Sequence, residues 1–166
     1  MGELISGHDA TFMMAAFLEA EKAAKRGDYG IGAVVVHEQE VISKAGNEIM
    51  TRSGAQYAHA EFLALEKIRD TPIYRPNRAG GLTVYTTLGP CPQCWGLMMV
   101  NGIGRIVYGA ADPISTQDYA TSVPEIFRNP KRQIVEFGGD LGARCLKIFA
   151  RSREEIDTKL GYHVKK

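Results

Sequence analysis

Two short motifs in the sequence contain residue types that can build a metal site. His59 and Glu61 are separated by one residue, and Cys91 and Cys94 follow within Pro90-Cys91-Pro92-Gln93-Cys94. One imidazole and two thiolates are typical zinc ligands, and three protein ligands leave a coordination position for water, whereas a structural site is closed by four. The motifs therefore predict a hydrolytic zinc centre held by His59, Cys91 and Cys94.

The spacing of these residues constrains the elements that carry them. Cys91 and Cys94 are three residues apart and share one face of a helix. A helix that opens at Pro90 or Cys91 would favour the thiolates through the positive end of its dipole. His59 and Glu61 can converge only if both lie in a first helical turn, where side chains lean toward the N-terminus. We expect two helix starts that meet at one zinc ion.

Glu61 is not required as a ligand, so it is the candidate catalytic residue. Zinc lowers the pKa of a coordinated water toward neutrality. We expect Glu61 to take a proton from this water and deliver it to the substrate.

Two other interpretations of the cysteine motif were weighed. A C-x-x-C pair can be a redox centre or half of a structural zinc site. A redox pair leaves His59 and Glu61 unexplained. A structural site needs a fourth ligand, and the remaining candidates have no closely spaced partner: His8, His37, Cys145 and His163. Cys145 stands at helical spacing among apolar residues and is interpreted as a core residue.

Length and composition favour one domain over residues 1–166, since the chain is 45% hydrophobic and long enough for a core. No stretch has the length of a membrane span, and the N-terminus shows no signal pattern. Three cysteines make no disulfide framework, which predicts a reducing cytoplasmic location. The net charge of +1 is not typical of a protein that depends on many phosphate contacts.

Hydrophobic patterning predicts an alternation of helices and strands. A first helix is expected to be capped by Asp9 and to end at Gly27. Strands 31–36 and 41–46 form an antiparallel pair, and a helix at His59 ends before Pro72. Further strands are predicted over 82–87, 105–108 and 133–137, with helices over about 91–101 and from about 140 into the 150s, and a short turn near 124–127. This order predicts a three-layer α/β/α domain around a mixed five-stranded sheet.

The pattern H-x-E followed by P-C-x-x-C is the signature of zinc-dependent nucleobase deaminases. Over nearly its whole length the chain resembles the cytidine deaminase superfamily, most closely the branch of tRNA adenosine deaminases, fungal-type cytosine deaminases and bacterial guanine deaminases. Gly46-Asn47 resembles the G-x-N loop of that branch, and residues 104–113 resemble the adenosine deaminases. The resemblance implies that Asn47 and the backbone near Ala60 contact the substrate. For Asn47 the alternative is a turn residue that bonds its own backbone.

Two positions depart from the pattern of the adenosine deaminases. They usually have L-E-P-C before the first cysteine, but this chain has Leu88-Gly89-Pro90-Cys91, closer to the T-T-L-S-P-C of fungal cytosine deaminases. Gly89 removes a hydrogen-bond partner that could orient a ligand or substrate. Trp95, directly after the second cysteine, is interpreted either as a wall of the substrate pocket or as a core residue.

The predicted function is zinc-dependent hydrolytic deamination of an amino-substituted nucleobase or small nucleoside, with release of ammonia. The alternative within the class is a tRNA adenosine-to-inosine deaminase. A catalytically silent zinc protein on the same fold is the alternative of another class, and the intact Glu61 argues against it. The net charge and Gly89 favour a small substrate, while basic residues around 128–132 favour tRNA. Residues 161–163 were considered as an aromatic lid over the site or as a free tail.

The resemblance also implies a homodimer with the Cys91 helix near the interface. Met98, Met99, Val100 and Ile103 are more apolar than the surface helix of a monomer requires. The alternative is that these four residues are core.

Overall fold

The computed structural model describes residues 5–74, 81–114 and 131–161, and all structural statements concern these residues. The predicted turn near 124–127, Arg128 and residues 162–163 lie outside them. The elements follow one another in the order α1 (Gly7–Arg26), β1 (Gly32–His37), β2 (Glu40–Gly46), α2 (Ala60–Glu66), β3 (Leu82–Leu88), α3 (Pro92–Val100), β4 (Arg105–Ala110), β5 (Gln133–Glu136) and α4 (Gly139–Leu160).

The strands form one mixed sheet in the order β2-β1-β3-β4-β5. β1 is antiparallel to both β2 and β3, whereas β3, β4 and β5 run parallel. The β1–β2 hairpin turns at Glu38 and Gln39, whose φ angles of 49° and 66° match the twist of a tight hairpin. The predicted five-stranded mixed sheet is confirmed.

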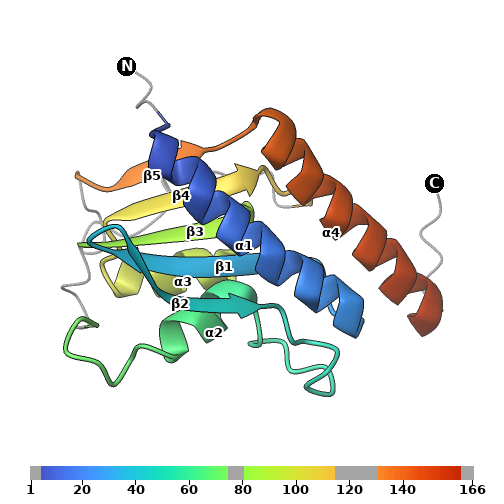
Figure 1. Ribbon diagram of the computed structural model, residues 1–166. Helices are drawn as coiled ribbons and strands as arrows, with labels where there is room; N and C mark the ends of the chain where they lie inside the picture. The colour runs from blue at the N-terminus through green and yellow to red at the C-terminus, as the bar shows by residue number, and fades with distance from the viewer. Residues whose placement is uncertain (1–4, 75–80, 115–130, 162–166) are drawn as a thin grey trace.

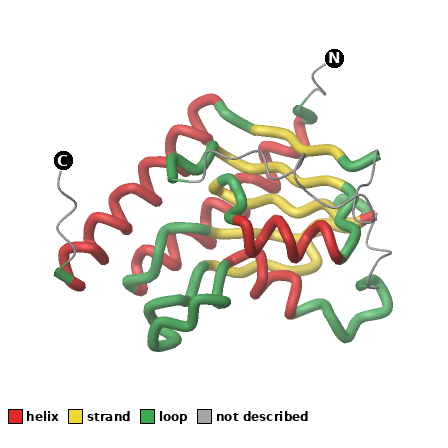
Figure 2. The backbone as a smooth tube through the Cα atoms, turned by 180° about the vertical axis from the view of Figure 1, so that it is seen from behind, coloured by secondary structure: helices red, strands yellow, loops and turns green. Residues whose placement is uncertain are grey.

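Helices cover both faces of the sheet. α1 and α4 lie on one face (Figure 1), and α2 and α3 lie on the other, which is turned toward the viewer in Figure 2. Each face has its own buried cluster of apolar side chains. Because the central strands are covered on both faces, β1 and β3 are nearly continuous buried runs. The predicted three-layer α/β/α arrangement is confirmed.

The start of α1 differs from the prediction. Ser6, not Asp9, is the N-cap, and its hydroxyl accepts a hydrogen bond from the Asp9 N–H at 3.3 Å. The Asp9 carboxylate accepts one from the Ser6 N–H at 2.7 Å, so the two residues form a capping box. The prediction was wrong because Ser and Asp are both favoured N-cap residues, so residue type alone does not distinguish them. In the structure Asp9 lies within the first turn and pairs with Arg105 on β4.

The close packing of α1 on β1 depends on Gly32. A Cβ at this position would collide with the backbone of Ala16 and Ala20 in α1. The helix can therefore lie directly against the strand only where the side chain is absent. None of the helices in the described part of the chain has the length and apolar composition needed to cross a bilayer.

Candidate metal and catalytic site

The two sequence motifs stand at the first turns of α2 and α3. β2 and β3 are each antiparallel to β1, so they run in the same direction and their carboxyl ends lie at the same edge of the sheet. α2 follows β2 and α3 follows β3, so both helices begin at this edge. The fold thereby brings together two motifs that are about thirty residues apart.

His59 and Cys91 occupy the N-cap positions of α2 and α3. A side chain at an N-cap usually accepts a hydrogen bond from its own helix, but neither His59 nor Cys91 does so. Their side chains are thus available to a metal. The first residue of α3 is Pro92, directly after the predicted start at Pro90 or Cys91, because either proline fits a helix start and only the backbone geometry distinguishes them.

The three candidate ligand atoms converge. His59 Nδ1 lies 3.4 Å from Cys91 Sγ and 3.5 Å from Cys94 Sγ, and all three atoms lie within 4.8 Å of one another. Zinc bonds of about 2.3 Å to sulfur and 2.0–2.1 Å to nitrogen place tetrahedral ligand atoms about 3.6 Å apart. The observed separations and the donor set therefore fit a zinc ion.

The ionisation of the ligands is consistent with a cation at this position. A hydrogen bond from Cys94 lowers the pKa of Cys91 to about 4, whereas the hydrogen bond with Cys91 and burial raise the pKa of Cys94. The hydrogen bond with Cys91 also raises the pKa of His59. One thiolate is thus stabilised by its neighbours alone, and a bound cation would stabilise the second.

Glu61 lies beside the ligand atoms without being one of the three. It is the second residue of α2 and its side chain is buried. Thr86 on β3 donates a hydrogen bond to Oε1 at 3.0 Å, and Cys94 Sγ lies 3.4 Å from Oε2. Burial raises the pKa of Glu61, which favours the form that carries a proton. A buried carboxyl group thus lies next to the metal position without being needed as one of its three ligands.

A cavity of about 210 Å³ adjoins these groups. Its polar lining residues are Asn47, His59, Glu61, Cys91, Asp112 and Arg153. Gly89 also lines it, and the remaining walls are aromatic or aliphatic: Tyr29, Ile31, Ile49, Leu88, Ile114 and Phe149. A largely apolar cavity with a few convergent polar groups is the usual form of a small-ligand site.

Asn47 forms the local hydrogen bond expected of a turn residue and also lines the cavity. Its side chain is buried, and Oδ1 accepts a hydrogen bond from the Ile49 N–H at 3.0 Å, as expected of a turn residue. Asn47 thus stabilises its own loop with the oxygen, while the amide nitrogen has no hydrogen-bond partner among the described residues.

Of the other predicted substrate contacts, Gly89 lines the cavity, whereas Ala60 and Trp95 do not. Gly89 donates its N–H to the Ala110 carbonyl at 2.8 Å, and a Cβ there would lie only 3.0 Å from the Asp112 nitrogen. A side chain at position 89 would therefore crowd the segment that follows β4. Ala60 and Trp95 are buried in the core between the sheet and α2–α3 and do not line the cavity. The structure thus places Trp95 in the core, which was the alternative interpretation.

Most of the cavity residues were not singled out from the sequence, among them three that come from the second half of the chain. Asp112 follows β4, and Phe149 and Arg153 are four residues apart on one face of α4. Ser152 holds this part of α4 against the loop before β1, because its hydroxyl accepts a hydrogen bond from the Gly30 N–H at 2.7 Å. The helical spacing of Phe149 and Arg153 was visible in the sequence, but it did not show what that face contacts.

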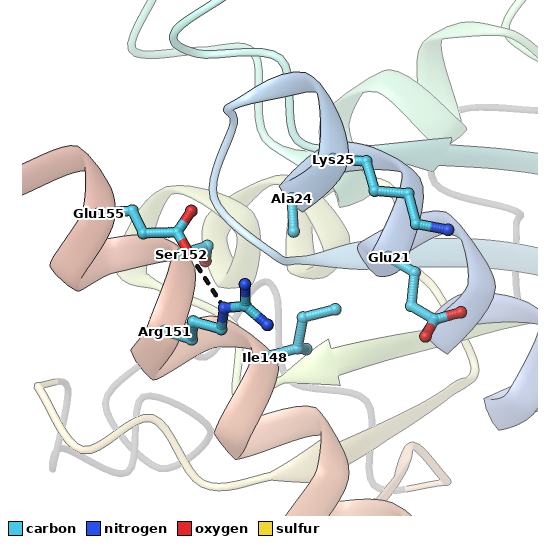
Figure 3. Close-up of a pocket in the computed structure, with 7 residues that line it drawn as sticks. All are labelled: Glu21, Ala24, Lys25, Ile148, Arg151, Ser152 and Glu155. Atoms are coloured by element: carbon cyan, nitrogen blue, oxygen red, sulfur yellow. Dashed lines mark hydrogen bonds and ion pairs between the residues drawn. The ribbon is translucent and has the colours of Figure 1, made fainter.

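A larger cavity of about 420 Å³ lies between α1 and α4 (Figure 3). Glu21 and Lys25 line it from α1, and Arg151 and Glu155 line it from α4, where they form an ion pair at 3.0 Å. None of the zinc-binding or predicted substrate-binding residues reaches it. Size alone therefore does not identify the reaction site in this fold.

An α/β/α domain in which one histidine and two cysteines converge at two helix starts, beside a buried carboxyl group, is a zinc-binding domain. The family described as the cytidine and deoxycytidylate deaminase zinc-binding region matches residues 6–110. The chain belongs to this family, which confirms the resemblance and the expectation of zinc.

Individual relatives are similar over much of the chain. The tRNA-specific adenosine deaminase of Bacillus subtilis is 37% identical over 105 residues, which cover 63% of this chain and 63% of that protein. The chain thus spans somewhat less than two thirds of that relative's length. A structure from a study of A-to-I editing by tRNA deaminases at the wobble position is 28% identical, covers 76% of this chain and 97% of its own, and has a TM-score of 0.64. The guanine deaminase of Nitrosomonas europaea is 18% identical, with coverage of 91% and 86% and a TM-score of 0.64, and shows the shared fold alone.

Proposed function

We propose that the protein is a zinc-dependent deaminase that hydrolyses the exocyclic C–N bond of an amino-substituted nucleobase and releases ammonia. The observation that carries this proposal is the position of Glu61. It lines the cavity beside the three zinc-ligand atoms, is buried, and is not itself required for the metal. A structural zinc site consists of four protein ligands and does not require a buried carboxyl group that is not a ligand.

The residues divide the chemistry as follows. His59, Cys91 and Cys94 would hold zinc, which would act as a Lewis acid and lower the pKa of a water molecule. Glu61 accepts one proton of the attacking water and passes it to the ring nitrogen as the oxygen adds to the ring carbon. Glu61 then takes the proton of the added hydroxyl group and gives it to the amino group, so the C–N bond breaks, ammonia leaves and the C=O bond forms. The hydrogen bond from Thr86 holds Oε1 of Glu61, so we assign the proton transfers to Oε2, which lies 3.4 Å from the sulfur of the zinc ligand Cys94.

The partly exposed residues of the cavity suit a substrate larger than a free base. Asp112 and Arg153 are partly exposed whereas Asn47 and Glu61 are buried, so the first two lie on the solvent side. A carboxylate can accept a hydrogen bond from a ribose hydroxyl, and a guanidinium can bind a phosphate. Phe149 adds an aromatic surface on which a base can stack.

The chemistry of these cavity residues and the similarity to tRNA deaminases together favour an adenosine presented within tRNA over the small substrate predicted from the sequence. The Bacillus subtilis relative is a tRNA-specific adenosine deaminase. The argument for a small nucleoside is the charge balance: Arg153 and Arg151 are each paired with a carboxylate on α4, at 3.4 and 3.0 Å, and the net charge is only +1.

The test is ammonia release by the zinc-loaded protein across cytosine, guanine, adenine, their nucleosides and a tRNA anticodon stem-loop, with Glu61→Gln protein as the control. We expect inosine in the stem-loop. Release from nucleosides or free bases alone would assign a small substrate. Absence of release from every substrate would contradict the deaminase proposal and favour a silent zinc protein.

A further inference from the structure

The segment from Asn47 to Thr51 carries a cavity residue on a loop, yet it is held by contacts from the end of α1. We propose that Arg26 and Asp28 form a positioning pair that presents the Asn47 amide nitrogen to the substrate. This inference rests on the proposed function, since the partner of that nitrogen is the substrate. Neither Arg26 nor Asp28 lines the cavity, so neither is assigned a catalytic role.

Asp28 binds the backbone of the loop at Met50 and Thr51. Its side chain is fully buried, and Oδ1 accepts hydrogen bonds from the backbone N–H groups of Met50 and Thr51 at 2.9 and 3.0 Å. Oδ2 accepts from the Thr51 hydroxyl at 3.0 Å and from Arg26 Nε at 3.2 Å. Four donors on one carboxylate satisfy a buried charge and fix the loop backbone relative to α1.

Arg26 connects this carboxylate to Asn47. While Nε donates to Asp28, the terminal nitrogen Nη2 donates to the Asn47 carbonyl oxygen at 2.8 Å. The guanidinium is planar and rigid, so both contacts are set together. The Asn47 N–H donates to the Ile31 carbonyl at 2.9 Å, and Oδ1 accepts from Ile49. With the backbone held on both sides and the oxygen engaged, the free amide nitrogen of Asn47 has a defined direction.

The end of α1 supplies the rigidity. The helix ends at Gly27 in the left-handed conformation, with φ of 92°, and the Asp28 N–H bonds back to the Ala23 carbonyl at 3.0 Å. This turn places Arg26 and Asp28 on the same side, facing the loop. A binding group on a loop is held more precisely when its supports belong to a packed helix, and α1 is packed against the sheet along its buried face.

The kinetic test is a double-mutant cycle with Asn47→Ala. Arg26→Met removes the hydrogen bond to the Asn47 carbonyl. The Arg26 side chain is 40% exposed, so we expect this variant to fold. Asp28→Asn weakens the hydrogen bond that orients Arg26. We expect each to lower kcat/KM about fivefold or more, mainly through KM, and to change it less than about twofold in the Asn47→Ala background.

Asp9→Asn is the matched control. Asp9 is as buried as Asp28 and also binds an arginine, but its contacts lie between α1 and the sheet. Its effect on kcat/KM should be the same with and without Asn47. If Arg26→Met and Asp28→Asn are equally harmful in both backgrounds, their effects are additive and the positioning pair is refuted.

Amide hydrogen exchange gives a readout that does not require activity. Arg26→Met and Asp28→Asn should accelerate exchange across residues 47–51, and Asp9→Asn should not. Unchanged exchange in this loop would overturn the proposal. If the wild-type protein releases no ammonia from any substrate, the proposed function fails, and the exchange measurement still decides whether the pair holds the loop.

Discussion

At the residue scale, the site is built from side chains that avoid their usual local partners. His59 and Cys91 stand at N-caps but make no capping hydrogen bond, and Glu61 is a first-turn carboxyl group buried under Thr86. His59 and Cys91 thus lack the usual stabilising contact of an N-cap side chain and lie at the metal position instead. Such exceptions to local rules are expected at functional sites.

Replacement of Glu61 by Gln should separate metal binding from turnover. The variant keeps the shape of the side chain and the three ligands, so we expect undiminished zinc by elemental analysis. Turnover should fall by about 10²–10⁴-fold or more, since one group serves several proton transfers. Cys91→Ala is the converse control and should lose zinc. Near-normal ammonia release by Glu61→Gln would contradict the role of this residue.

Thr86→Val tests how Glu61 is oriented. The substitution keeps the volume of a fully buried side chain but removes the donor to Oε1, so we expect kcat to fall by about tenfold, corresponding to one net hydrogen bond. Thr86→Ser restores the hydroxyl and should recover most of the activity. Thr87→Val is the comparison, because the Thr87 hydroxyl accepts from the Gly32 N–H and has no contact with Glu61. Equal losses of kcat in both valine variants would show a general packing defect.

At the element scale, α1 is fastened to the sheet by a buried polar cluster. Asp9 accepts two hydrogen bonds from Arg105 on β4, at 2.7 and 2.9 Å, and one from the Tyr85 hydroxyl on β3 at 2.6 Å. Burial alone raises the pKa of Asp9, but these hydrogen bonds outweigh it and hold the pKa well below its usual range. Burial and the hydrogen bond to Asp9 raise the pKa of Tyr85, and Arg105 opposes this shift.

Asp9→Asn should therefore destabilise the protein in a pH-dependent way. At neutral pH we expect a loss of about 2–3 kcal/mol in the free energy of unfolding, because the charge-assisted bonds to Arg105 are removed. The native pKa lies below the unfolded value of about 3.9, so the advantage of the wild type is present above that value and shrinks as the pH falls below it. Urea unfolding of both proteins between pH 7 and pH 3 measures this difference. A difference that does not change with pH would exclude an ionised Asp9.

At the scale of the whole molecule, the α2–α3 face exposes apolar side chains. Of the four residues considered for the dimer interface, Met98, Met99 and Ile103 are buried in the core, and Val100 is 47% exposed. Tyr57 and Ile73 are also exposed on the segments that flank α2. A shallow cavity of about 160 Å³ on this face is lined mainly by apolar side chains: Phe62, Leu65, Tyr74 and Leu97.

We expect a homodimer through this face. Val100→Arg should shift the protein toward monomer in analytical ultracentrifugation at micromolar concentration, because a charge would be buried without a partner at the interface. Leu18→Arg is the matched control, since Leu18 is 48% exposed on α1. A monomeric wild type, or equal dissociation of both variants, would contradict the prediction.

The sequence by itself identified the three residues that lie together as candidate zinc ligands, the buried carboxyl group beside them and most of the elements, because these depend on residue type and short spacing. Two thiols three residues apart at a helix start, and the β-branched run of β1, are local signals that tertiary context did not override. Helix starts were less certain, since Ser6 and Asp9, or Pro90 and Pro92, satisfy the same local rules.

Only the tertiary structure decided which remote residues complete the site. Asp112 reaches the cavity because it follows β4 in the sheet. Phe149 and Arg153 reach it because α4 packs its apolar face against α1, β3 and β4. The support of Asn47 by Arg26 and Asp28 spans the end of one helix and a loop about twenty residues away. Helical spacing shows which side chains share a face, but what that face contacts is set by nonlocal burial and hydrogen bonding across the whole domain.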